Sequence, residues 1–208
     1  MTSSPSTAVQ PSDWCNWSGS QRHRARVVAP TDVDQVIAVV QAARDAGRTV
    51  RCVGSAHSFV PFWTDDVIVV LDGLDGIRAV DRSRRTATIA AGTKLHALGP
   101  LLWAEGLSLP QQGDIDRQSL AGALSTGTHG TGRTLPSLPN FLVGMTLVTA
   151  DGSVRELTRE QDGELFRAAQ VGQGVFGVMV DATLALDPAF NLHERSWSCP
   201  FAECAAEH

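Results

Sequence analysis

The stretch Val53-Gly54-Ser55-Ala56-His57-Ser58-Phe59 follows a short segment, Thr49–Val53, that is typical of a strand. It consists almost entirely of small residues. Small residues let consecutive backbone N–H groups approach and surround one anion, as they do in phosphate-binding loops. The residues alone leave two alternatives open: an anion-binding loop with His57 at its centre, or a tight turn with an exposed histidine.

A second run of small residues lies downstream, between Ser119 and Gly132. Such segments usually pack against another backbone or a planar ligand. The spaced leucines argue against the alternative, a glycine-rich linker. Asp114 and Asp116 precede this run and could act as an acid–base pair, or they could provide favourable charge at a helix N-terminus. The second alternative is favoured for Asp116, and both stay open for Asp114.

The segment Gly172–Gly177 spells GxGxxG, but its context is the reverse of a dinucleotide-binding site. That site needs a strand before the glycines and a helix after them. Here a predicted helix, Asp162–Ala169, comes first, and a predicted strand, Val175–Leu186, follows. We therefore interpret the segment as a flexible turn between helix and strand.

The remaining patterns predict a mixture of helices and hairpins. Helices are expected from a cap at Thr31 to Gly47, over Thr93–Glu105 and over Gln118–Leu124, with a buried strand at Val67–Leu71. Hairpins are expected at Ile77–Val80 with Thr86–Ala90, and at Val143–Thr149 with Ser153–Leu157. This order predicts an α+β fold of two sublobes, the second with a mainly antiparallel sheet.

The composition is that of an ordinary globular chain of 208 residues, with 43% hydrophobic and 19% charged residues. The net charge is -5 and no basic stripe is present, so nucleic acid is a poor candidate partner. No run approaches the ~20 apolar residues that span a bilayer. The first 13 residues lack the apolar core of a signal peptide and are expected to be a disordered leader.

The four cysteines form no CxxC pair, and we interpret them as reduced thiols of a cytoplasmic protein. A metal cluster of His193, Cys199, Cys204 and His208 is disfavoured, because zinc-binding pairs usually lie closer together in sequence. No metal site is predicted.

Together these segments resemble the FAD-binding domain of the vanillyl-alcohol-oxidase superfamily, the PCMH-type fold. Within that superfamily they look most like the sugar-1,4-lactone oxidases (gulonolactone and arabinonolactone oxidase) and alditol oxidase. The resemblance is carried by Asn16–Gly19, Val28–Thr31, Val53–Phe59 and Gly113–Gly122, and it continues to Gly132. Matching segments recur in order from about Asn16 to Pro188.

The resemblance implies FAD as the cofactor and assigns roles to individual residues. The loop matching Val53–Ser58 wraps the pyrophosphate, and His57 matches a histidine bonded covalently to the 8α-methyl group of the isoalloxazine. Asp114 falls where alditol oxidases have a serine near flavin and substrate, which favours the aldonolactone branch and makes Asp114 a possible substrate or flavin contact. The implied cofactor-binding residues are Val53, Gly54, Ser55, Ala56, His57, Ser58, Asp114, Ser119, Gly122, Ala123, Leu124, Ser125 and Val178. The segment Val171–Gly177 departs from the family's tight turn, which puts flavin contacts there in doubt.

The implied activity is oxidation of a CH–OH group of a sugar lactone, such as D-arabinono- or L-gulono-1,4-lactone, or of a polyol. Hydride would pass to the covalent flavin and electrons onward to O2 or another acceptor. Membrane association occurs among related lactone oxidases, but nothing in this chain indicates it.

The expected organisation is a leader over 1–13, an FAD-binding domain over 14–188 with sublobes at about 14–84 and 85–188, and a tail or the start of a truncated cap domain over 189–208. In the family the cap supplies substrate-binding and catalytic groups, so no catalytic residue is assigned with certainty. Two alternatives stay open. One is a truncated, non-catalytic flavin-binding remnant or a subunit that needs a partner's cap; the other is an α+β domain that binds no ligand.

Overall fold

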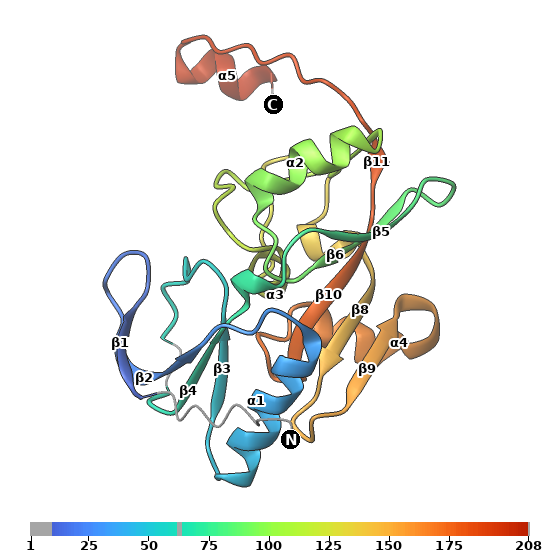
Figure 1. The fold of residues 1–208 in the computed structure, drawn as a ribbon. Helices are drawn as coiled ribbons and strands as arrows, with labels where there is room; N and C mark the ends of the chain where they lie inside the picture. The colour runs from blue at the N-terminus through green and yellow to red at the C-terminus, as the bar shows by residue number, and fades with distance from the viewer. Residues whose placement is uncertain (1–9, 62–63, 208) are drawn as a thin grey trace.

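Two β-sheets organise the chain into two lobes, as the α+β prediction requires (Figure 1). The computed structural model describes residues 10–61 and 64–207. Helix α1 lies against both lobes, and α2 covers the far end of the second lobe (Figure 1).

The first lobe contains a four-stranded sheet with the order β1-β2-β4-β3. Its elements are β1 (Ser12–Cys15), β2 (Arg22–Val28), α1 (Val33–Asp45), β3 (Val50–Val53) and β4 (Val67–Val70). The β1–β2 pair is antiparallel, whereas β4 runs parallel to both β2 and β3. Because β3 is parallel to β4, the loop that follows Val53 leaves the sheet at the carboxyl edge, next to the second lobe.

Helix α1 begins one residue later than the sequence predicts. Asp32 is the N-cap, and its carboxylate accepts a hydrogen bond from the Gln35 backbone N–H at 2.8 Å. Thr31, the predicted cap, instead accepts from the Gln35 side chain at 3.0 Å. The ionised carboxylate also suits the positive end of the helix dipole.

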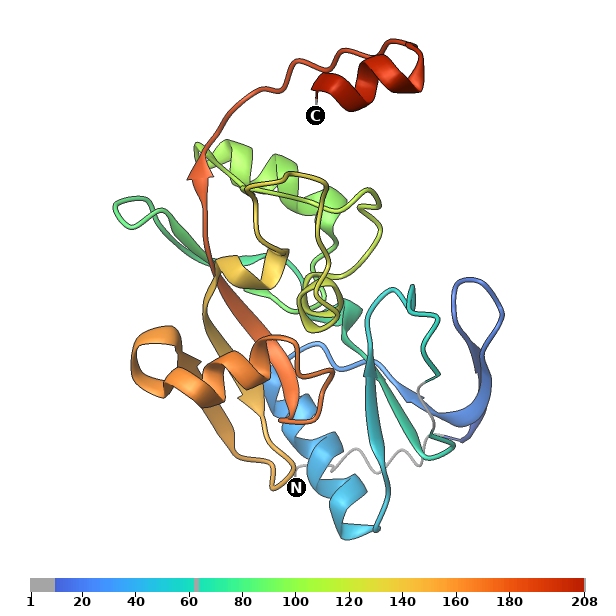
Figure 2. The same ribbon diagram turned by 180° about the vertical axis from the view of Figure 1, so that it is seen from behind.

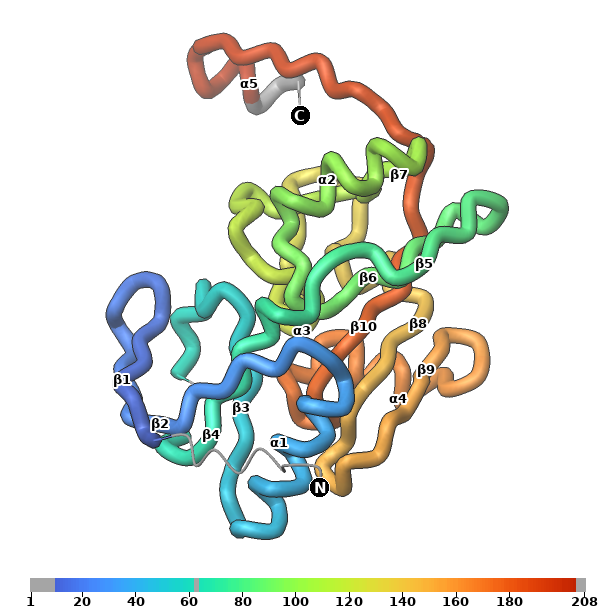
Figure 3. The backbone as a smooth tube through the Cα atoms, viewed as in Figure 1, coloured from blue at the N-terminus to red at the C-terminus, as the bar shows by residue number. Residues whose placement is uncertain are grey.

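The second lobe is an antiparallel five-stranded sheet with the order β5-β6-β10-β8-β9, and both predicted hairpins are present. Figure 3 traces β10 between β6 and β8. The strands are β5 (Ile77–Asp81), β6 (Thr86–Ala90), β8 (Leu142–Val148), β9 (Val154–Thr158) and β10 (Val178–Ala185). The helices are α2 (Leu95–Ala104), α3 (Leu120–Ser125) and α4 (Arg159–Gln170), with short 3-10 turns at Leu71–Gly73 and Leu138–Phe141. A minor ladder joins β7 (Leu107–Ser108) to β11 (Asp187–Pro188).

One hydrophobic core runs through both lobes and fixes their relative positions. Strand side chains alternate between the two faces of a sheet. Val67 and Val69 of β4 therefore face this main core, while Ile68 joins a smaller cluster with Ala25 and Val53 on the opposite face. Buried residues of α1, α2 and α3 belong to the main core. Strand β4 of the first lobe and helix α3 of the second lobe are therefore held in place by the same core.

The structure corrects two of the predicted boundaries. A lobe boundary at 84/85 would separate β5 from β6, which pair along one hairpin, so the change of lobe falls between β4 and β5. Ser12 and Asp13 belong to β1 and pair with β2, so ordered structure begins before residue 14. The rest of the predicted leader, residues 1–9, lies outside the described residues.

The final strand also differs from the prediction, since β10 starts at Val178 and residues 175–177 belong to the preceding turn. After Pro188 the chain leads to α5 (Phe201–Glu207), which stands away from both lobes in two opposite views (Figure 1, Figure 2). Trp197 and Phe201 are 67% and 86% exposed, so this segment contributes nothing to the core. None of the helices in the described part of the chain is long and apolar enough to cross a membrane.

The β8–β9 turn offers a test of the fold through pH. The Asp151 carboxylate accepts hydrogen bonds from the Thr149 hydroxyl at 2.5 Å and the Ser153 N–H at 3.0 Å, and these bonds lower the pKa of Asp151 to about 2. A depressed pKa stabilises the fold above the unfolded-state value, and the contribution is lost as pH falls through the folded-state value. We expect Asp151→Asn to melt a few degrees below the wild type at neutral pH. In thermal melts across pH, that difference should close on acidification towards pH 2. A difference that is constant with pH would contradict the role of the charge.

Candidate functional site

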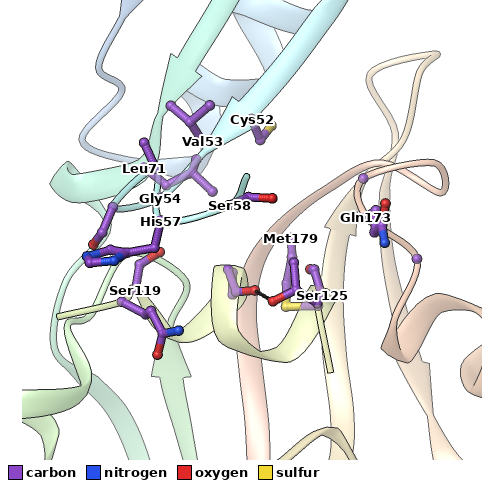
Figure 4. A pocket seen from close by; sticks show the side chains of 18 of the residues that line it. Cys52, Val53, Gly54, His57, Ser58, Leu71, Ser119, Ser125, Gln173 and Met179 are labelled. Atoms are coloured by element: carbon purple, nitrogen blue, oxygen red, sulfur yellow. Dashed lines mark hydrogen bonds between the residues drawn. The ribbon is translucent and has the colours of Figure 1, made fainter. Parts of the chain in front are cut away.

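A cavity of about 220 Å³ lies between the lobes (Figure 4). The loop 54–58 after β3 forms its first-lobe wall. Helix α3 and the turn 172–177 between α4 and β10 form the second-lobe wall. Three segments far apart in sequence therefore meet at one site.

Three carbonyl groups of the loop 54–58 accept hydrogen bonds from residues of the segment 16–21. The Ala56 carbonyl accepts from the Trp17 backbone N–H at 3.2 Å, and the His57 carbonyl accepts from the Trp17 indole N–H at 3.1 Å. The Ser58 carbonyl accepts from the side chains of Asn16 and Gln21, each at 3.3 Å. These bonds fix the peptide planes of the loop.

The backbone N–H groups of the same loop are not used in hydrogen bonds to the described part of the chain. Within residues 10–61 and 64–207, no backbone N–H from Gly54 to Ser58 has a protein acceptor. Ala56 has a φ of 54°, a left-handed conformation that is uncommon for a residue with a Cβ. Successive N–H groups in such a turn form a concave anion-binding nest. The geometry thus favours the anion-binding loop over a plain turn.

A cation stands beside this loop. The Lys94 ammonium donates to the Ser55 hydroxyl at 2.8 Å and to the Asp72 carboxylate at 2.7 Å. Lys94 immediately precedes α2, so its position is fixed by the second lobe. Because the Asp72 carboxylate compensates its charge, the contribution of Lys94 to the loop is the hydrogen bond that orients the Ser55 hydroxyl.

Helix α3 divides its residues between cavity and core. Ser119, Gly122 and Ser125 recur every three positions and line the cavity, as helical periodicity allows. The intervening Ala123 and Leu124 are fully buried in the core. The predicted run of flavin-contacting residues 122–125 is therefore split by the helix into two faces.

Two polar side chains of this wall have atoms that bond to no other described residue. The Gln118 side-chain oxygen is buried without a hydrogen bond, and the Ser119 hydroxyl, in a residue only 1% exposed, bonds to no described residue. A buried polar atom left unsatisfied costs ~1–3 kcal/mol. Both groups are thus available to a polar ligand in the cavity.

Gly54 lies in close contact with Ser119 of the opposite wall. A Cβ at this position would lie 1.7 Å from the Ser119 hydroxyl oxygen and 3.0 Å from its Cβ. Any larger residue would push the loop away from α3. Glycine is therefore required here by contact rather than by backbone angle.

His57 lies in the cavity wall at the centre of the loop (Figure 4). Its ring is stacked on Trp17, with centroids 5.0 Å apart and planes inclined by 23°. Neither ring nitrogen has a hydrogen-bond partner in the described part of the chain. The stack on Trp17 therefore covers a face of the imidazole and leaves the ring edge, which carries both nitrogens, open to a ligand.

The turn Gly172–Gly177 is a part of the wall that sequence reasoning did not assign. Gly172, Gln173, Gly174, Phe176 and Gly177 all line the cavity. Helix α4 precedes this turn and β10 follows it, so the reversed GxGxxG context is confirmed. The density of glycines was the available signal. It marks close approach to a ligand even where the dinucleotide motif does not apply.

Other lining residues were not assigned in advance because they are ordinary core or strand residues in sequence. They are Trp14, Asn16, Gln21, Cys52, Leu71, Gln118, Ala121, Thr126, Leu147, Ala169 and Met179. Among the lining residues that the structure describes, Cys52 and His57 are the only titratable ones. Burial raises the pKa of the Cys52 thiol to about 12, with the nearby Arg51 acting in the opposite direction.

Of the thirteen predicted cofactor-binding residues, four lie outside this cavity wall. Asp114 is exposed in its loop, and Ala123 and Leu124 face the core. Val178 is 5% exposed and lines a neighbouring cavity, although the flanking Gly177 and Met179 line the main one. The other nine, Val53–Ser58, Ser119, Gly122 and Ser125, are brought together.

No metal site competes with this cavity among the described residues, where no group of three or more His, Cys, Asp or Glu could hold a metal ion. Of the four residues considered for a cluster, His208 lies outside the described residues.

Comparison with known proteins places these observations in a family. Residues 25–158 match the model of the FAD binding domain family. The chain is 40% identical over 184 residues to an L-gulono-1,4-lactone dehydrogenase of Mycobacterium tuberculosis, covering 88% of this chain and 42% of the relative. It is also 40% identical over 184 residues to a D-arabinono-1,4-lactone oxidase of Eremothecium gossypii, covering 86% of this chain and 35% of the relative. The chain thus spans about two-fifths or less of these proteins.

Solved structures share the fold. BBE-like 1 of Physcomitrella patens superimposes with a TM-score of 0.75 at 24% identity, covering 83% of this chain and 38% of that one. A chitooligosaccharide oxidase gives 0.71 at 20% identity, covering 86% and 41% respectively. At these identities the likeness shows the fold alone.

Proposed function

This chain belongs to the FAD binding domain family, with FAD as its cofactor, and from that premise we propose that it is the flavin-holding part of an oxidoreductase acting on sugar-derived 1,4-lactones. The observation that carries the proposal is the inter-lobe cavity. It combines the N–H groups of Gly54–Ser58, which have no acceptor among the described residues, with a wall of small residues on α3.

The residues present fit FAD. The loop 54–58, whose N–H groups have no acceptor among the described residues, suits the doubly charged pyrophosphate. The unpartnered Gln118 oxygen and Ser119 hydroxyl can bond to polar atoms of the cofactor. The glycines at 54, 172 and 177 let the backbone segments of the cavity wall pack closely on their neighbours, which shapes the cavity.

We further propose that His57 carries the flavin covalently. Attachment forms a C–N bond between an imidazole nitrogen and the 8α carbon of the isoalloxazine. The methyl group and the imidazole each lose one hydrogen, and the two electrons pass to O2, which becomes hydrogen peroxide. The support is the position of His57 in the cavity wall, with both ring nitrogens unpaired among described residues.

When bound, the flavin supplies the redox chemistry, taking two electrons and a hydrogen from a CH–OH carbon for delivery to O2 or another acceptor. The chain's own residues bind and orient it. The 1,4-lactone substrate is proposed because the two relatives compared above, an L-gulono-1,4-lactone dehydrogenase and a D-arabinono-1,4-lactone oxidase, are named for such substrates. Asp114 stays a proposed substrate contact.

A second candidate is a flavin-binding subunit whose substrate-activating groups come from another polypeptide. The cavity favours it in one respect, because no carboxylate or lysine lines the described wall to act as a base. Cys52, with its pKa at about 12, is poorly suited to that task at neutral pH.

The test is a visible spectrum of the purified chain, before and after acid precipitation. We expect a flavin absorption band that stays with the acid pellet and a fluorescent band in a denaturing gel. A colourless protein that takes up no added FAD would sink the proposal. Anaerobic addition of L-gulono- or D-arabinono-1,4-lactone then separates the two candidates. Bleaching of the flavin supports oxidation by this chain, and an unchanged spectrum supports the partner-dependent subunit.

A further inference from the structure

Trp17 makes three separate contacts with the histidine loop. Its backbone N–H bonds to the Ala56 carbonyl at 3.2 Å, its indole N–H bonds to the His57 carbonyl at 3.1 Å, and its ring stacks on the His57 imidazole. We propose that Trp17 is a positioning residue that orients the His57 imidazole for covalent attachment to the flavin. This inference rests on the proposed covalent link.

The contacts restrain the two rotations that matter for attachment. The bond to the His57 carbonyl fixes the peptide from which the side chain projects, and the stack, at 5.0 Å and 23°, restricts rotation of the ring. Stacking uses the face of the imidazole and leaves its edge, where both nitrogens lie, without a partner in the described chain. Attack on a methyl carbon requires a nitrogen lone pair in line with that carbon, so a fixed ring plane raises the rate.

A role in the core does not account for Trp17. The side chain is 54% exposed, so it buries little apolar surface. Its neighbour Asn16 is 2% exposed and ties the loop together through Gln21 and Ser58, which is a structural role. Phe59 packs its edge on Trp17 at 5.9 Å and 71°, holding the indole against the histidine. The exposed indole is thus fixed by contacts that serve His57.

The experiment compares Trp17→Ala, Trp17→Phe and Trp103→Ala with the wild-type chain. Trp103 is a matched control, since it is 52% exposed and lies on α2, away from the cavity wall. Chain produced without riboflavin is mixed with FAD. Covalent incorporation is followed by gel fluorescence and intact mass, and non-covalent binding by quenching of FAD fluorescence.

We expect Trp17→Ala to attach FAD about tenfold more slowly, as loss of one aromatic stack and one hydrogen bond implies. Its initial non-covalent affinity should stay within about threefold of the wild type, since the anion-binding N–H groups are not removed. Trp17→Phe keeps a ring face but lacks the indole donor, so it should recover part of the rate. Trp103→Ala should match the wild type.

Three results would overturn the inference in distinguishable ways. Equal attachment rates for Trp17→Ala and Trp103→Ala would exclude positioning. Loss of non-covalent FAD affinity in both Trp17 variants would show a scaffold role instead. A wild-type chain that binds FAD without ever attaching it would remove the covalent proposal and this inference together, while leaving the flavin-binding function intact.

Discussion

Replacing His57 with alanine is expected to abolish covalent flavin while leaving a yellow protein. The cavity wall, the loop N–H groups and the small residues of α3 do not depend on the imidazole. FAD should therefore still bind, but all of it should appear in the supernatant after acid precipitation, with no fluorescent band in a denaturing gel. The measurement is the fraction of total flavin found in the acid pellet, which should fall from near unity in the wild type to the background of the assay.

The control for this variant is His129→Ala. His129 is exposed, lies in the same class of glycine-rich segment and does not line the cavity. It should retain covalent flavin in full. If the His57→Ala variant keeps its covalent flavin, the bond lies elsewhere and Cys52 is the next residue to test. Its thiol lines the same cavity, although a pKa of about 12 leaves little of the reactive thiolate at neutral pH.

The fold was predictable wherever the pattern was local. The hairpins β5–β6 and β8–β9 follow from short-range alternation and turn residues, and both are present. Strand β2 was not predicted, because arginines at 22, 24 and 26 mask its apolar positions. Its place is set by parallel pairing of Arg26 with Val67, a contact between segments about forty residues apart. Such pairing depends on tertiary packing that local propensity does not encode.

The candidate site could be predicted from sequence where a single short segment forms a whole part of the wall. The loop 54–58 was identified from its small residues, and the structure places all of it in the cavity wall. On α3 the sequence did not separate the two faces of the helix: periodicity turns the side chains of Ala123 and Leu124 into the core and leaves Gly122 and Ser125 at the cavity. The turn 172–177 reaches the wall only because β10 pairs with β8. The density of glycines in the turn was the available signal, but the partner across the cavity is set by this long-range pairing.

Gly54→Ala is expected to disturb both stability and FAD binding, because the new Cβ would lie 1.7 Å from the Ser119 hydroxyl oxygen. One wall must move. Overpacking of this kind costs ~1–3 kcal/mol, and each kcal/mol corresponds to roughly 2–4 °C in Tm for a chain of this size. Since the loop amides move with Gly54, FAD affinity should fall by about tenfold or more, the equivalent of ~1.4 kcal/mol.

The matched control is Gly144→Ala on β8, where a Cβ would meet Thr183 at an ordinary 3.5 Å and the backbone needs no positive φ. It should be neutral or slightly stabilising, because glycine weakens a strand interior. The double variant Gly54→Ala with Ser119→Ala removes the closest clash and leaves a Cβ contact at 3.0 Å. In thermal melts it should recover more than half of the decrease in Tm caused by Gly54→Ala. In fluorescence quenching it should recover part of the FAD affinity. Strictly additive effects of the two substitutions would show that Gly54 and Ser119 do not press on each other, and the contact between the lobes would then have no part in shaping the cavity.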